Sequence, residues 1–176
     1  MRNGVDICAI FNYGYVVTTR IIILIMGYDR QKQKHVSKHS RFKQGVIDPK
    51  SCRKLFESVS NVPIKYQSEL ELKFIRYCES CSSIAHWANE PIAIKYVSRI
   101  DGKVHEYFPD FIIESVTGKR TLIEIKPYDQ SQKPGPNASL WLKTSWVKNV
   151  DKWKAAKEYC ENRGMTFMIV TEKFFV

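Results

Sequence analysis

Two acidic residues and a lysine in the second half of the chain have the spacing of a metal-dependent catalytic site. Asp110 follows Pro109, and Glu124 and Lys126 are separated by one residue, which places both on one face of a strand. Two carboxylates held together repel each other unless a cation lies between them or one is protonated. Their hard oxygen atoms favour Mg²⁺ or Mn²⁺. Such an ion, with a lysine beside it, supports phosphodiester hydrolysis.

The hairpin between the two acidic residues decides whether they share a face of the sheet. A three-residue turn that ends at Gly118, in the left-handed conformation, pairs Glu114 with Arg120 across the strands. In the same register Asp110 lies opposite Glu124, so both point to one side. A two-residue turn would shift the register by one residue and separate them. The favourable charge pair therefore predicts the three-residue turn.

A helix predicted before these strands supplies a third carboxylate. Ser68 has the character of a helix N-cap, and Glu69 and Glu71 lie in the first turn, where they complement the helix dipole. The apolar residues that recur at helical spacing, over three to four turns, are Leu70, Phe74, Tyr77, Cys78 and Cys81. Glu71 lies at the edge of this stripe, whereas Glu69 faces outward with Lys73 as its partner. We expect Glu71 to join the site as a ligand, directly or through water.

The remaining elements predict an α/β (α+β) fold in the order helix, three strands, helix, strand. The predicted segments are strands at 92–97, 104–114 and 120–126, a loop at 127–139, a helix at 150–162 and a strand at 165–170. Pro109 within the second strand indicates an edge, a bulge or a bend. The last strand is almost entirely apolar, which predicts a place in the middle of the sheet.

Charge indicates the class of partner. The chain has 176 residues and a formal net charge of +10. A small, strongly basic protein favours a polyanionic partner, with nucleic acid the commonest and an acidic membrane surface the alternative. The apolar run at 13–26 contains Arg20 and is shorter than the ~20 residues that a spanning helix needs, so no membrane segment is expected.

These patterns divide the chain into three parts. Residues 1–25 form an apolar extension, which either precedes a natural start at Met26 or packs on the domain, and residues 26–65 form a basic arm. Residues 66–176 form the catalytic domain. The arm is expected to have little regular structure from Arg30 to Lys54 and to follow DNA phosphates. The residues predicted to bind DNA are Lys32, Lys34, Lys38, Arg41, Lys43, Lys133 and Lys143, with Lys148 and Lys152 along the same groove.

Cysteine and tryptophan have mostly structural interpretations. The five cysteines are odd in number and scattered, which does not indicate a disulfide framework. Cys78 and Cys81 suit one face of a helix better than a zinc site, because no second ligand pair follows. The tryptophans could stack on bases, but packing in the core or in an interface is favoured. They are Trp87, Trp141, Trp146 and Trp153.

The element order, together with Glu71, Asp110, Glu124 and Lys126, resembles the PD-(D/E)xK, restriction-endonuclease-like superfamily, whose core is a central mixed sheet flanked by helices. Within it the chain is similar to the head completion nucleases of T-even-type tailed bacteriophages. The segments that carry this similarity are 66–68, Trp87 with Glu90, 107–108, 123–127, 149–156 and 163–172. The nuclease domain of the transposase subunit TnsA shares the pattern more distantly.

The resemblance implies a Mg²⁺- or Mn²⁺-dependent nuclease that cuts double-stranded DNA as an endonuclease, with exonuclease action a further expectation. Asp110, Glu124 and the main-chain carbonyl of Ile125 would bind the metal. Phage head, portal or neck proteins would be partners, and the host cytoplasm during virion assembly, or the virion itself, would be the location. Two alternatives are a structural head-closure protein with a vestigial site and a transposase or repair endonuclease of the same fold.

Overall fold

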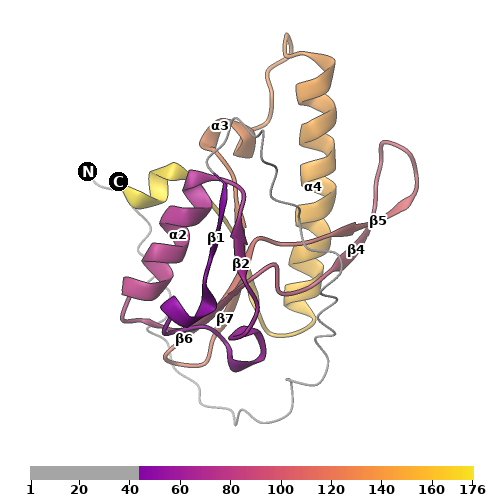
Figure 1. Ribbon diagram of the computed structural model, residues 1–176. Coiled ribbons are helices and arrows are strands. Elements are labelled where there is room, and N and C mark those ends of the chain that lie inside the picture. The colour runs from indigo at the N-terminus through magenta and orange to yellow at the C-terminus, as the bar shows by residue number, and fades with distance from the viewer. Residues whose placement is uncertain (1–43) are drawn as a thin grey trace.

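A four-stranded mixed sheet lies between two helices at the centre of the protein (Figure 1). The computed structural model describes residues 44–176. The sheet strands in spatial order are β3 (Ile84–Asn89), β6 (Phe111–Ser115), β7 (Arg120–Ile125) and β8 (Thr166–Val170), and the helices are α2 (Glu69–Ser80) and α4 (Leu140–Glu161). Only the β7–β8 pair is parallel in this sheet. The arrangement confirms the predicted restriction-endonuclease-like architecture.

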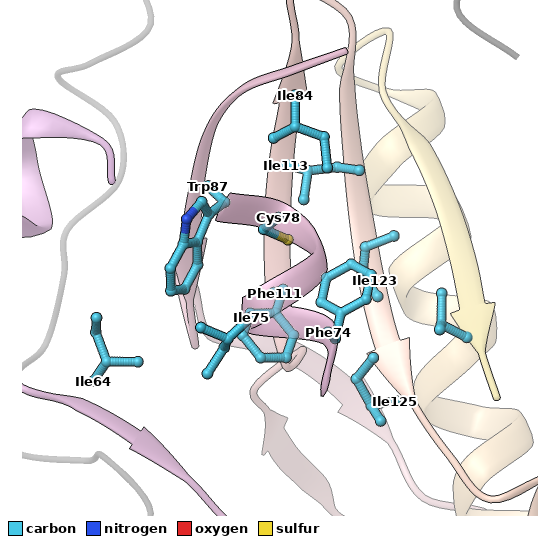
Figure 2. Packing of buried hydrophobic residues seen from close by; sticks show 11 residues of the cluster. Ile64, Phe74, Ile75, Cys78, Ile84, Trp87, Phe111, Ile113, Ile123 and Ile125 are labelled. Atoms are coloured by element: carbon cyan, nitrogen blue, oxygen red, sulfur yellow. The ribbon is translucent and has the colours of Figure 1, made fainter. Parts of the chain in front are cut away.

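Alternate residues of β6 and β7 face opposite helices, because successive side chains of a strand point to opposite faces. Ile113 and Ile123 pack with Phe74 of α2 (Figure 2). Leu122 packs with Ala156 of α4 on the other face. Odd-numbered residues of β7 therefore face α2 and even-numbered residues face α4, which assigns Glu124 to the α4 side.

Helix α2 begins where the sequence predicts. The Ser68 hydroxyl accepts a hydrogen bond from the main-chain N–H of Glu71 at 3.1 Å and so caps the first turn. The buried residues of the helix are Leu72, Phe74, Ile75 and Cys78. Their spacing gives one apolar face, which packs on the sheet as in Figure 2.

The β6–β7 hairpin has the predicted three-residue turn. Ser115 N–H donates to the Lys119 carbonyl at 2.9 Å, and Gly118 has φ +81°. Glu114 pairs with Arg120, whose Nε lies 2.6 Å from the Glu114 carboxylate. The register is therefore the one that places Asp110 and Glu124 on the same face.

The predicted strand at 104–114 is two strands. β5 (Val104–Tyr107) pairs with β4 (Ile94–Val97) in a separate antiparallel sheet that projects beyond α4 (Figure 1), whereas β6 starts at Phe111. Pro109 lies in the bend between β5 and β6 and is fully buried. The proline has no N–H to donate to a ladder, so the chain changes sheets there, as a bend at this residue predicts.

Three other element predictions were wrong. β3 was not predicted, although it carries the fully buried Trp87. β8 lies at an edge of the sheet rather than in the middle, and it is apolar because Met168 packs against the core on one face and Phe167 against the core on the other. α4 begins at Leu140 rather than near Val150, and a short helix, α3 (Tyr128–Ser131), lies in the predicted loop. The helical spacing of Leu142, Trp146, Val150 and Trp153 was a signal for this earlier start that the prediction did not use.

The segment before α2 is folded, contrary to the prediction of an irregular arm as far as Lys54. β1 (Gly45–Ile47) pairs antiparallel with β2 (Ile64–Tyr66). Short 3₁₀ turns lie at Pro49–Ser51, Glu57–Val59 and, at the C-terminus, Glu172–Phe175. Trp87 N–H donates to the Lys54 carbonyl at 2.8 Å, so this segment covers the outer edge of β3. Residues 1–43, with the expected extension and most of the basic arm, lie outside the described residues.

Three of the four tryptophans pack as predicted, and the fourth does not. Trp87 is fully buried, Trp153 is 6% exposed, and Trp146 packs edge-on against Trp153 with ring centroids 5.5 Å apart. Trp141, in the first turn of α4, is 72% exposed. Packing in the core therefore does not explain Trp141.

The cysteines of the described part carry free thiols. They are Cys52, Cys78, Cys81 and Cys160. Burial raises the pKa of the Cys78 thiol well above its usual value, which leaves the thiol protonated and unreactive. In the same part of the chain, no helix combines the length and apolar character that crossing a membrane requires.

The left-handed conformation of Gly118 leads to a stability prediction. Gly118→Ala should lower the free energy of unfolding by about 1–2 kcal/mol, because an L-residue is strained at this φ although no neighbouring atom obstructs the new methyl group. Gly135→Ala is the matched control, since Gly135 has equally open surroundings and no positive φ. Urea unfolding of both variants tests this, and equal losses in the two variants would contradict it.

Candidate active site

Asp110 and Glu124 form a buried carboxylate pair on the α4 side of the sheet. Asp110 immediately precedes β6, and Glu124 lies one step beyond the Phe111–Ile123 pair on β7. The two residues are 6% and 3% exposed. The hairpin register therefore brings both carboxylates to one place, as the sequence predicts.

Main-chain hydrogen bonds hold Asp110 in position. The N–H of Ile125 donates to Asp110 Oδ2 at 2.7 Å, and the N–H of Glu90 donates to the Asp110 carbonyl at 2.8 Å. The fixed backbone around Asp110 thus aims its side chain at the end of β7.

Side chains hold Glu124. The Tyr107 hydroxyl donates to Glu124 Oε2 at 2.6 Å, and Lys126 Nζ lies 3.0 Å from Oε1. The main-chain N–H of Lys126 donates to the Val170 carbonyl at 3.0 Å. This bond extends the pairing of β7 with β8 and so fixes the position of the Lys126 backbone. Lys152 of α4 lies at the rim, with Nζ 5.6 Å from the centre of the Tyr107 ring.

Burial governs the electrostatics of this pair. Burial raises the pKa of Glu124, and the neighbouring Asp110 raises it further, while Lys126 and the Tyr107 hydroxyl oppose the change. Burial and Glu124 also raise the pKa of Tyr107 far above its usual value, so Tyr107 remains a hydroxyl donor. A single ammonium group compensates two buried carboxylates only in part, which makes the pair a favourable place for a divalent cation.

The structure does not bring Glu71 to this pair. α2 packs on the opposite face of the sheet, and the Glu71 carboxylate accepts hydrogen bonds from the Gln67 N–H at 2.8 Å and the Ser68 hydroxyl at 3.0 Å. The third residue of the helix therefore bonds back to the N-cap side chain and to the main chain that precedes it, in the manner of a capping box. Across residues 44–176 no group of three or more His, Cys, Asp and Glu side chains lies close enough to hold a metal.

The donors that are present still suit Mg²⁺ or Mn²⁺. Asp110 and Glu124 offer carboxylate oxygens, and Ile125, between Glu124 and Lys126, offers a main-chain carbonyl. Mg²⁺ is commonly held in proteins by one or two carboxylates and keeps several waters, with substrate phosphates completing its shell. Two carboxylates and a carbonyl therefore meet the requirement without Glu71.

The residues predicted to bind DNA fall into two groups. Lys32, Lys34, Lys38, Arg41 and Lys43 lie outside the described residues. Lys133 and Lys143 are exposed near the start of α4, and Lys143 Nζ donates to the Pro136 carbonyl at 2.5 Å. Both of these ammonium groups are accessible from solvent.

Two residues of the site were not identified as functional from the sequence. Tyr107 ends β5, a strand whose other residues are exposed, so strand alternation gives no signal for a buried hydroxyl. Glu90 has φ +42° and is the one non-glycine residue with a positive φ among residues 44–176. Its strained backbone directs its N–H to Asp110, and strain of this kind is often found next to functional groups. A residue before proline is expected to be extended, so the place of Glu90 before Pro91 did not signal its positive φ.

The chain is similar in sequence to a family of endonucleases and to a phage nuclease. Residues 81–172 match the family described as TnsA-like endonuclease N terminal, and this range contains Asp110, Glu124 and Lys126 but not Glu71. The chain is also 34% identical over 118 residues to the head completion nuclease of Enterobacteria phage T4, an alignment that covers 62% of this chain and 79% of that protein.

The raised pKa of Glu124 predicts how stability depends on pH without metal. The Glu124 carboxyl stays protonated to a higher pH in the folded protein than in the unfolded chain, where its pKa is the ordinary 4.5. The free energy of unfolding therefore falls as pH rises beyond 4.5. In EDTA near pH 7, Glu124→Gln should therefore be more stable than the unsubstituted protein, and the difference should shrink towards pH 4. Thermal unfolding across this pH range is the measurement.

Glu114→Gln is the matched control, because Glu114 lies on the same hairpin in a more exposed ion pair with Arg120. This variant should show no gain in stability near pH 7. A Glu124→Gln protein that is less stable than the unsubstituted protein near pH 7 would contradict the assignment of repulsion to the pair.

Proposed function

The chain belongs to the TnsA-like endonuclease family, and we propose that it is a metal-dependent deoxyribonuclease acting in phage head completion. The observation that carries the proposal is the buried Asp110–Glu124 pair with Lys126 Nζ 3.0 Å from Glu124, inside the part of the chain that matches an endonuclease family. The similar phage protein is named for head completion, which supports the same step here.

Asp110, Glu124 and the Ile125 carbonyl are the proposed ligands of Mg²⁺ or Mn²⁺. When bound, the ion would lower the pKa of a water molecule and stabilise charge on the phosphate oxygens. Glu71 is better assigned to capping α2, since its carboxylate bonds to its own N-terminal segment.

Lys126 and Tyr107 have separate proposed roles. The Lys126 ammonium, oriented by Glu124 and 24% exposed, would orient the attacking water and offset charge on the scissile phosphate. Tyr107 would fix the second Glu124 oxygen, which limits rotation of the carboxylate. Because both carboxylates are buried, these interactions act in a medium of low dielectric constant, where they are stronger than in water.

Double-stranded DNA is the proposed substrate. A net charge of +10 favours contacts with phosphates, which are independent of sequence. The predicted phosphate-binding residues are Lys133 and Lys143 in the described part, and Lys32, Lys34, Lys38, Arg41 and Lys43 in the arm. Phage head, portal or neck proteins are proposed partners, and the host cytoplasm during assembly is the proposed location.

Two alternatives keep the fold and change the activity. A structural head-closure protein would need no catalytic site, and the retention of Asp110, Glu124 and Lys126 together argues against it. A transposase-type or repair endonuclease is favoured by the family match at 81–172. Supercoiled and linear DNA incubated with the protein would separate endonuclease from exonuclease action, and a protein that cuts neither would support the structural role.

Substitution of the site should abolish cleavage. Asp110→Asn removes a charged metal ligand and Lys126→Ala removes the ammonium group, and each should lower the cleavage rate by at least about a hundredfold. The assay follows supercoiled plasmid in Mg²⁺, with EDTA as the blank. Arg120→Ala is the matched control, because Arg120 is a carboxylate-paired cation at the opposite end of β7. Equal cleavage by Asp110→Asn and the unsubstituted protein would show that the site is wrong.

DNA binding should depend strongly on salt. Lysine and arginine contacts to phosphates release counterions, so affinity for a duplex in EDTA should fall at least about tenfold between about 50 and 200 mM salt. Fluorescence anisotropy of a labelled duplex measures this directly. An affinity that stays flat over this range would argue against binding through phosphates.

A further inference from the structure

The first half of α4 extends past the sheet and exposes large apolar side chains (Figure 1). No residue from 140 to 150 is buried, whereas the second half contributes Trp153, Ala156 and Cys160 to the interior. Leu140, Trp141 and Leu142 are 81%, 72% and 43% exposed. A contiguous exposed patch of this kind marks an interaction surface.

Most of the charges around this patch are positive, and Asp129 is the one acidic residue that lines the pocket beside Trp141. Between residues 132 and 150 the charged side chains are Lys133, Lys143 and Lys148, each exposed. The nearest following acid, Asp151, is buried and bonded to the Arg99 side chain and main chain. An apolar surface with three cations and one acid around it carries a net positive charge, which complements a polyanion that also carries flat apolar groups. Nucleic acid with accessible bases fits this description.

One face of α4 connects this patch to the candidate active site. Trp141, Ser145, Lys148 and Lys152 follow each other at spacings of three and four residues, so they lie on one face. Lys152 lies above the Tyr107 ring, and Tyr107 bonds to Glu124. The rise per residue places Trp141 roughly 16 Å along the helix from Lys152. This separation is about five nucleotides of a stacked strand at ~3.4 Å each.

A small pocket lies beside Trp141, between α4 and the segment that follows Lys126. Trp141, Trp146 and Asn149 line it from the helix, and Gln130 and Gln132 line it from α3 and the next residues. Amide groups beside an aromatic ring can hydrogen-bond to the edge of a base while the ring stacks on its face. The pocket thus adds polar groups to the stacking surface.

We propose that this surface, formed by Gln130, Gln132, Trp141, Ser145, Lys148 and Lys152, binds unpaired nucleotides of DNA next to the cut site, with Trp141 stacked on a base. The inference rests on the proposed nuclease function and specifies its substrate class: duplex DNA with an overhang, flap or frayed end. Contacts to the backbone of an intact duplex require only cations and leave an exposed tryptophan without a role. Stacking on an unpaired base would give the exposed Trp141 ring a role.

Binding of labelled duplexes in EDTA tests the proposal without cleavage. The duplexes are blunt, or carry a single-stranded overhang of about two or about ten nucleotides, of which only the longer exceeds the separation from Lys152 to Trp141. Trp141→Ala should lower affinity for the long overhang at least about fivefold and leave the blunt and short-overhang duplexes within about twofold. Trp141→Phe, which keeps an aromatic ring, should restore most of the affinity.

Val97→Ala is the matched control, because Val97 is 62% exposed on β4, away from this face of α4. It should leave all three affinities unchanged. Equal losses on all duplexes for Trp141→Ala, or no loss on the long overhang, would overturn the proposal. So would sedimentation that shows a dimer of the unsubstituted protein dissociated by Trp141→Ala, with DNA binding intact, since the surface would then join two copies of the chain.

Cleavage in Mg²⁺ is measured separately on the same duplexes. An unsubstituted protein that binds the long overhang through Trp141 but cuts no DNA would refute the nuclease proposal and leave the binding surface supported. A protein that cuts blunt and overhanging duplexes equally, with no effect of Trp141→Ala on binding, would refute the surface and leave the nuclease proposal supported.

Discussion

Repulsion between two buried carboxylates is the constraint around which this domain is organised. Asp110 and Glu124 come from adjacent strands and are almost inaccessible to solvent, an arrangement that raises the pKa of Glu124. The Ile125 N–H, the Tyr107 hydroxyl and the Lys126 ammonium each offset part of the cost. The buried pair lowers the stability of the protein without metal, and a divalent cation between the carboxylates would restore it. Local loss of stability of this kind is characteristic of functional sites.

The rest of the fold keeps the pair in place. β7 lies between β6 and β8, and the two faces of the sheet are covered by α2 and α4. The segment at 45–66 covers the outer edge of β3, so the sheet presents no free strand there. The two cores, with Ile125 in one and Leu122 in the other, hold β7 from both faces beside Asp110.

Helix α4 serves two purposes along its length. Its second half buries Ala156 and Cys160 against the sheet, while its first half is free of the core and carries Trp141. The Trp146 ring of the first half packs edge-on against the Trp153 ring of the second half. A single helix thus connects the packing of the domain, the rim of the site at Lys152 and the surface proposed to hold unpaired DNA.

The sequence by itself determined the features that depend on near neighbours: the Ser68 cap, the Gly118 turn, the Glu114–Arg120 register and therefore the shared face of Asp110 and Glu124. Only the tertiary structure decided which face of the sheet each helix covers, because that choice depends on packing between distant segments. It separated Glu71 from the carboxylate pair and brought Tyr107 to Glu124 across a change of sheet. It also decided that only the second half of α4 packs in the core, because the first half extends past the sheet.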